Sequence, residues 1–124
     1  MGYVEVDPYA KRLGIECLES GLETSVCRLV VKEEHFNGVG SVHGAVIFSL
    51  ADIVFACACN ATEERFIGMQ TEIRYMGMVK GTELLATAQL ISSSKRFLHY
   101  QVTVTDGFNT KVAFFTSTAF KLGA

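Results

Sequence analysis

The sequence predicts an α+β domain in which a curved antiparallel sheet wraps around one long central helix. Two observations support this prediction. The stretch from Gly44 to Cys59 is apolar except for Ser49 and Asp52, which is typical of a helix that is buried on nearly every side. Two strand-like runs precede this stretch and four follow it, and short turns predict that the last four form an antiparallel meander.

Length and composition limit the functions that the chain can have. Its 124 residues predict a single domain over residues 1–124. A net charge of −2 without a basic block argues against a nucleic-acid partner. Residues 1–7 lack the basic and apolar regions of a secretion signal, and the apolar stretch is shorter than the roughly 20 residues that a membrane span needs. We therefore expect a cytoplasmic protein with no membrane partner.

The N-terminal third is expected to form a short helix and a hairpin. Asp7 can cap a helix that continues through Pro8, and Gly14 suits the left-handed residue that ends it. Residues 15–20 and 22–31 have the composition of two strands, and the second is rich in β-branched side chains.

A charged, glycine-containing loop over residues 32–42 leads into the long helix, and four strands are expected after it. Asp106–Gly107 is a strong hairpin signal between apolar runs. Long strands leave unpaired edges, so we expect association of chains through a sheet edge or along the helix. The four expected strands are Phe66–Met76, Glu83–Ser92, Phe97–Thr105 and Lys111–Lys121.

The four cysteines are expected to be reduced and buried, because no secretion signal precedes them. Cys17 and Cys27 could face each other across the hairpin. Cys57 and Cys59 lie two residues apart on a helix, so their side chains diverge. Neither forms a zinc-like spacing with a histidine, and no metal site is expected.

Two motifs in the middle of the chain occur together: Asn–Gly–x–x–Ser–x–His–Gly from Asn37 to Gly44, and Leu–Ala–Asp from Leu50 to Asp52. With this spacing, they resemble the motifs of the hotdog-fold acyl-CoA thioesterase superfamily, in particular its PaaI (phenylacetate-degradation) type. The resemblance implies hydrolysis of an acyl-CoA such as phenylacetyl-CoA or a medium-chain acyl-CoA, with no separate cofactor. It also implies a homodimer with active sites at the interface, usually assembled into a tetramer.

The resemblance assigns a role to each residue of these motifs. Asp52 is the catalytic carboxylate, the backbone amide of Gly44 binds the thioester carbonyl, and the Asn37 side chain reaches the same carbonyl. His43 either caps the start of the helix or donates a proton. The alternative for Asp52 is a structural carboxylate satisfied by hydrogen bonds.

Four further positions bear on substrate binding. A related branch of the family orients the water with a serine shortly after the helix, and Gly68 stands at that position here. Gln70 or Thr71 is the candidate to replace this serine. Ala45 stands where the family usually has a second glycine, which predicts a narrower pocket.

Polar residues outside the motifs have less specific interpretations. Lys95 and Arg96 either hold the phosphates of coenzyme A or form an ordinary solvated turn. His35 is expected in an exposed loop and His99 on a strand. Ser49 is expected to donate to a backbone carbonyl one helical turn back.

The physical chemistry of the helix supports the same site without the family. Its N-terminus presents unsatisfied N–H groups and a partial positive charge, and Gly44 and Ala45 are small enough for a carbonyl to approach. Asp52 lies eight residues further on, about 12 Å along the axis, too far to act on that carbonyl. An antiparallel partner helix would bring the two groups together, so a monomer is expected to be inactive. Asp52 is then either a general base or a nucleophile.

Two other functions remain open from the sequence. One is an enoyl-CoA hydratase or dehydratase on the same fold, which would require His43 or His99 beside Asp52. The other is a non-catalytic acyl-CoA binding protein.

Overall fold

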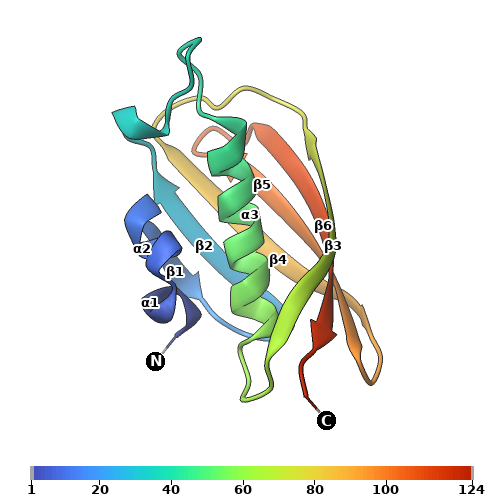
Figure 1. Ribbon diagram of the computed structural model, residues 1–124. Coiled ribbons are helices and arrows are strands. Elements are labelled where there is room, and N and C mark those ends of the chain that lie inside the picture. The colour runs from blue at the N-terminus through green and yellow to red at the C-terminus, as the bar shows by residue number, and fades with distance from the viewer. Residues whose placement is uncertain (1, 124) are drawn as a thin grey trace.

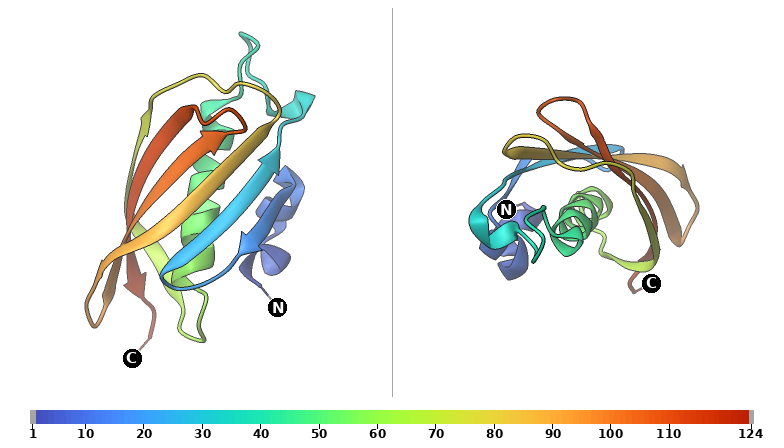
Figure 2. Two further views of the ribbon diagram at one scale, coloured as in Figure 1. Left: turned by 180° about the vertical axis from the view of Figure 1, so that it is seen from behind. Right: turned by 90° about the horizontal axis from the view of Figure 1, so that it is seen from above.

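One long helix, α3 (Gly44–Cys59), lies against a six-stranded antiparallel sheet in the computed structural model, which describes residues 2–123 (Figure 1). The strand order is β1-β2-β4-β5-β6-β3. Viewed from above, the sheet curves around α3 (Figure 2). The bounds of α3 agree with the apolar stretch in the sequence, and the predicted architecture is confirmed. The predicted domain, 1–124, extends one residue beyond each end of the described range.

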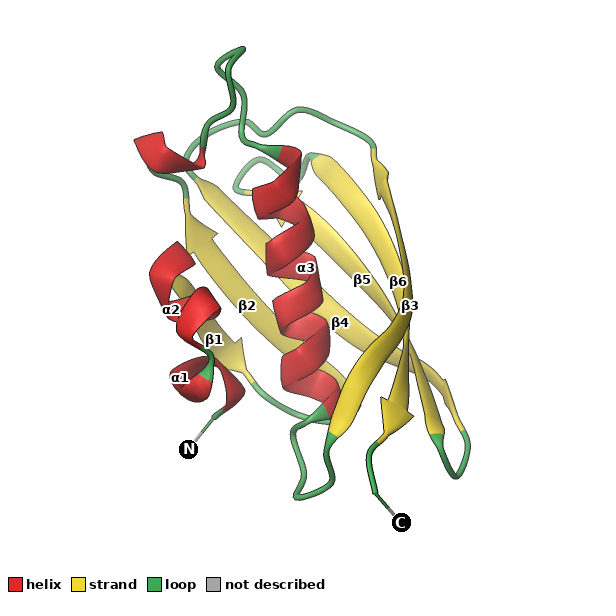
Figure 3. Ribbon diagram, in the orientation of Figure 1, coloured by secondary structure: helices red, strands yellow, loops and turns green. Residues whose placement is uncertain are grey.

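Two short helices precede the first hairpin, and they lie on the same face of the sheet as α3 (Figure 3). The sequence did not predict α1 (Tyr3–Val6), whereas α2 (Pro8–Leu13) begins and ends as expected. The Asp7 carboxylate accepts hydrogen bonds from the amides of the second and third residues of α2, and Gly14 ends it at a φ of 83°. The hairpin is confirmed as β1 (Ile15–Glu19) and β2 (Thr24–Val30).

One stripe of α3 is left uncovered by the sheet. The side chains of Leu50, Ala51 and Val54 are fully buried, because the concave face of the sheet closes over that side of the helix. Residues spaced three or four apart on the other side stay partly or fully exposed: Ala45, Ser49, Asp52 and Ala56. The helix therefore has one narrow accessible face, with Asp52 at its middle, that another molecule could contact.

The predicted four-strand meander is wrong at its first strand. β4, β5 and β6 follow one another in the sheet, but β3 pairs with β6 at the far edge, and β4 pairs with β2. The residues between β3 and β4 cross one end of the sheet instead of forming a tight turn (Figure 1). The four strands are β3 (Phe66–Tyr75), β4 (Glu83–Ser93), β5 (Phe97–Asp106) and β6 (Lys111–Lys121).

Asp106 holds this crossing segment to the β5–β6 turn. Its carboxylate accepts the amide of Lys80 at 2.7 Å and those of Phe108 and Thr110 at 2.9 Å. Burial of Asp106 opposes ionisation, but the three amide donors outweigh it and lower the pKa of the side chain to about 2. The Asp–Gly pair therefore forms the predicted hairpin turn, and Asp106 also holds the segment between β3 and β4, which is distant in sequence.

Two smaller predictions need correction. His35 is buried rather than exposed: its Nδ1 accepts the Lys32 amide at 2.9 Å, which leaves Nε2 to donate to the Leu13 carbonyl at 3.2 Å. Cys17 is exposed, because β1 is an edge strand. Within residues 2–123, no helix combines the length and the apolar character that are needed to cross a membrane.

Candidate active site

The N-terminus of α3 has one amide left for a ligand. His43 is the N-cap residue, and its Nδ1 accepts the Ala45 amide at 3.0 Å. The His43 carbonyl accepts the amides of Val46 and Ile47 at 3.0 and 3.2 Å. Of the first four amides, only that of Gly44 has no hydrogen-bond partner among the described residues. Gly44, and not Ala45, is therefore the available oxyanion donor.

Tyr75 fixes the position of this amide from the end of β3. Its hydroxyl donates to the Gly44 carbonyl at 3.0 Å, and a Cβ on Gly44 would lie 3.4 Å from the Tyr75 ring. A side chain at position 44 would therefore be in ordinary van der Waals contact with the ring. Tyr75 was not predicted as a site residue, because an aromatic residue near the end of a strand has no distinctive pattern.

Asn37 is positioned in the preceding loop as a donor. Its side-chain oxygen accepts the amides of Val39 and Ser41, both at 3.0 Å, so the orientation of the side chain is set by the loop that it stabilises. The Asn37 Nδ2 group has no partner among residues 2–123. This nitrogen is the group that the predicted contact with the thioester carbonyl requires.

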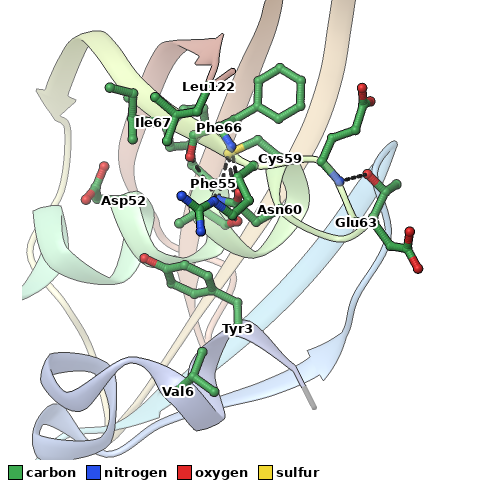
Figure 4. Close-up of a pocket in the computed structure, with 15 residues that line it drawn as sticks. Tyr3, Val6, Asp52, Phe55, Cys59, Asn60, Glu63, Phe66, Ile67 and Leu122 are labelled. Carbon is green, nitrogen blue, oxygen red and sulfur yellow. Dashed lines mark hydrogen bonds between the residues drawn. The ribbon is translucent and has the colours of Figure 1, made fainter. Parts of the chain in front are cut away.

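Asp52 lines a pocket of about 640 Å³, and Figure 4 shows its carboxylate between the side chains of Tyr3 and Ile67. Burial of Asp52, together with the negative charge of Asp7, raises the pKa of its carboxyl group. Among the described residues no hydrogen bond offsets this effect. A structural carboxylate would be satisfied by such bonds, so the arrangement favours the functional interpretation of Asp52.

Tyr3, on α1, is a polar residue of this pocket that was not predicted from the sequence. Burial of Tyr3, with the nearby charges of Asp7 and Asp52, raises its pKa to about 12. The phenol therefore keeps its proton at neutral pH, and Asp7 influences it more strongly than Asp52 does. Nothing in the sequence distinguished Tyr3, because the helix that carries it is only four residues long.

The structure separates the candidates that were expected to replace the water-orienting serine. Gly68 lines the Asp52 pocket, whereas Gln70 lies beside His99 in a separate hollow on the outer face of the sheet. Thr71 faces α3, but its hydroxyl is hydrogen-bonded to that of Ser117 at 2.9 Å. Gln70 is therefore not brought to the site of this chain, and the Thr71 hydroxyl already has a partner.

Lys95 and Arg96 lie in the β4–β5 turn, at the opposite end of the sheet from the N-terminus of α3 (Figure 1). The Arg96 guanidinium donates to the Gly123 carbonyl at 2.7 Å. This contact uses Arg96 to hold the C-terminal segment. Binding of coenzyme A phosphates by these two residues stays a prediction.

Replacement of His43 by alanine is expected to lower the free energy of unfolding by about 1 kcal/mol, because the cap of the Ala45 amide is lost. His43→Asn should restore the stability and leave turnover close to that of the wild type, since asparagine also caps helices well. Chemical denaturation and steady-state kinetics measure the two effects. If His43→Asn restores the stability but not the turnover, His43 transfers a proton instead.

Asp7→Asn is expected to move the acid limb of the pH–activity profile to lower pH. Asp52 must be ionised to act as a base or nucleophile, and its raised pKa means that this form is lost as the pH falls through that value. Removing the like charge at Asp7 lowers the pKa of Asp52, while asparagine keeps the cap of α2. Glu5→Gln is the matched control on α1, and a limb that shifts equally in both variants would contradict the assignment.

The sequence is similar to those of known proteins. The family model described as the thioesterase superfamily matches residues 39–113. The acyl-coenzyme A thioesterase PaaI of Escherichia coli (strain K12) is 31% identical over 120 residues, which cover 96% of this chain and 86% of that protein. A putative esterase of Archaeoglobus fulgidus is 32% identical over 95 residues, which cover 76% of this chain but only 62% of the length of that protein.

Solved structures give the same result. The E. coli PaaI protein from the phenylacetic acid degradation operon has a TM-score of 0.88 at 30% identity, covering 97% of this chain and 88% of that one. A mutant of the phenylacetic acid degradation protein PaaI from Thermus thermophilus has a TM-score of 0.88 at 28% identity, covering 94% of this chain and 100% of that one. The chain therefore belongs to the thioesterase superfamily and has the hotdog fold that the resemblance implied.

Proposed function

We propose that this protein is an acyl-CoA thioesterase whose active site is formed by two copies of the chain. The observation that carries the proposal is the pair of unpartnered groups on α3. Within residues 2–123 the amide of Gly44 has no hydrogen-bond partner, and the half-buried Asp52 carboxylate lies about 12 Å along the same helix. In an antiparallel pair of helices, each amide would face the carboxylate of the other chain.

The two groups supply complementary parts of thioester hydrolysis. The Gly44 amide and the Asn37 Nδ2 group stabilise the negative charge that develops on the thioester oxygen. If Asp52 is the base, it takes a proton from the water that attacks the carbonyl carbon. The tetrahedral intermediate then collapses with cleavage of the carbon–sulfur bond, which releases the acid and CoA.

Asp52 can act instead as the nucleophile, through a mixed anhydride that water opens. A single turnover in ¹⁸O-labelled water identifies the nucleophilic route when water opens the anhydride at the Asp52 carbonyl. The label then enters the Asp52 carboxylate, which peptide mass spectrometry detects, and the first acid released is unlabelled. With a general base, the first acid released carries the label and Asp52 stays unlabelled.

Two exposed features support pairing of chains. The uncovered stripe of α3 contains Asp52, so a partner packed there would complete the pocket. β3 is an edge strand, and large apolar side chains are exposed along it and just after it. These side chains are Ile67, Met69, Tyr75, Met76 and Met78. We propose a homodimer joined at this edge, which assembles further into a tetramer. Light scattering measures the mass of the assembly in solution.

The acyl group is proposed to be aryl-acetyl, such as phenylacetyl, or medium-chain. Apolar side chains of Val6, Phe55 and Ile67 line the Asp52 pocket, which suits an apolar group of this size. The name of the E. coli relative points to phenylacetic acid degradation for that protein. A cytoplasmic location stays the expectation from the sequence.

The hydratase alternative receives no support from the site. Among residues 2–123, no histidine lines the Asp52 pocket. Nδ1 of His43 accepts the Ala45 amide, and His99 lies on the outer face of the sheet. An Asp–His pair, which that chemistry would need, is therefore not formed within the described part of the chain.

The test is hydrolysis of a panel of aryl-acetyl-CoA and straight-chain acyl-CoA substrates by the purified dimer. Loss of thioester absorbance is the better readout, because Cys17 is exposed and would itself react with a thiol reagent. Free acid should appear in equal amount to CoA, with the highest kcat/KM for one class of acyl group. Tight CoA binding without turnover on any substrate would contradict the proposal and indicate a binding protein.

A further inference from the structure

Three cysteines that are distant in sequence lie close together where α3 meets the first hairpin. This cluster is at the opposite edge of the sheet from β3. Cys17 comes from β1, Cys27 from β2 and Cys57 from α3, and their sulfur atoms all lie within 4.8 Å of one another. Cys17 and Cys27 are directly opposite in the hairpin. The Cys27 and Cys57 sulfur atoms are 3.8 Å apart.

This spacing is close to that of a tetrahedral zinc–thiolate site. With Zn–S bonds of about 2.3 Å, two sulfur ligands of one tetrahedral zinc ion lie about 3.8 Å apart. The Cys27–Cys57 pair already has that separation. Only a small movement is needed at Cys17, which is exposed at the edge of the sheet and is the least constrained of the three.

We propose that Cys17, Cys27 and Cys57 bind one thiophilic metal ion, Zn²⁺, with solvent as its fourth ligand. Cys27 and Cys57 are buried, so they form the floor of the site, and Cys17 forms its exposed rim. Three sulfur ligands and one open position give the ligand number of a zinc site that exchanges its fourth ligand.

A surface depression gives the ion access. It has a volume of about 520 Å³, and Cys17 lies on its wall between α1 and β1. Glu5 and Glu19 also line this depression, whereas the Glu16 carboxylate is paired with Arg28. The negative charge of Glu5 and Glu19 raises the local concentration of cations and disfavours anions at the opening.

The charges and protons of the site favour zinc over Cu⁺, the other thiophilic ion that three cysteines could take. Three thiolates with Zn²⁺ leave one net negative charge, whereas Cu⁺ leaves two beside the acidic rim. Each thiol releases its proton to solvent as its sulfur–metal bond forms, and binding therefore weakens as the pH falls.

No metal site was expected from the sequence, because the three cysteines have no zinc-like spacing along the chain. The hairpin places Cys17 opposite Cys27, and packing of α3 against β2 adds Cys57. The ion would join the first hairpin to the central helix. Bound zinc should therefore raise the melting temperature of the folded chain.

The test is titration of the reduced, metal-free full chain with Zn²⁺ against a chromophoric chelator. Co²⁺ serves as a spectroscopic probe of sulfur ligation and tetrahedral geometry. We expect one ion per chain, with affinity more than about 100-fold weaker in Cys17→Ser and Cys57→Ala. Cys59→Ala is the matched control, because Cys59 is buried on the same helix outside the cluster, and it should bind zinc as the wild type does.

The absence of a one-to-one zinc complex in the wild type would overturn the proposal. So would zinc binding by Cys17→Ser that equals the wild type, and this variant decides the matter even if Cys57→Ala does not fold, because Cys17 is exposed. Tight Cu⁺ binding against bicinchoninate without Zn²⁺ binding would overturn the choice of zinc. None of these measurements depends on thioesterase activity.

Discussion

Asp52→Asn should fold as the wild type does and lose at least about 1,000-fold in kcat. Asparagine has nearly the same shape, but it neither accepts a proton from water nor attacks a thioester, so either role of Asp52 is removed. The stability should not fall, because burial raises the pKa of Asp52 and no hydrogen bond from the described residues offsets the cost of its charge. Thioester hydrolysis and thermal unfolding measure the two quantities.

Glu72→Gln makes the same acid-to-amide change on β3, outside the Asp52 pocket, and should keep its turnover. A structural carboxylate would behave differently from a catalytic one. Its replacement would lower the melting temperature and leave kcat within about tenfold of the wild type. That outcome would remove Asp52 from the reaction.

Gly44→Pro is expected to lower kcat by about 100- to 1,000-fold, because it removes the one free amide among the described residues at the N-terminus of α3. Proline is well tolerated at the first helical position, where its missing N–H breaks no intrahelical bond. The preceding residue, His43, already has the extended conformation that proline requires, with ψ at 134°. The variant should therefore fold, and circular dichroism checks that it does.

Gly44→Ala is the control for this variant. It places a Cβ at the same distance from the Tyr75 ring but keeps the amide. Turnover by Gly44→Ala should therefore stay far above that of Gly44→Pro. Equal losses in the two variants would assign the effect to crowding at Tyr75 and contradict the role of the amide.

Most elements could be predicted from the sequence, because their signals are local. The Gly44–Cys59 helix has an uninterrupted apolar stretch, and α2 carries its own cap and stop. The position of β3 could not be predicted in this way. Its pairing with β6 depends on a crossing segment held by Asp106, a contact between residues that no local pattern connects.

The sequence motifs on α3 predicted part of the candidate site. Gly44 and Asp52 follow from one helix and its dipole, and the structure adds that His43 occupies the amide of Ala45. Gln70 was misplaced for a physical reason. A bulge between Gly68 and Gln70 shifts the pairing with β6, so counting along the strand assigns residues to the wrong face.

The central claim is that each active site takes its amide from one chain and its carboxylate from another. A hybrid dimer of one Gly44→Pro chain and one Asp52→Asn chain tests this claim directly, with two affinity tags used to purify it. In the hybrid, one site has lost both groups and the other keeps both, so about half of the wild-type turnover per dimer is predicted although each parent homodimer is inactive. A purified hybrid as inactive as its parents would contradict the shared site.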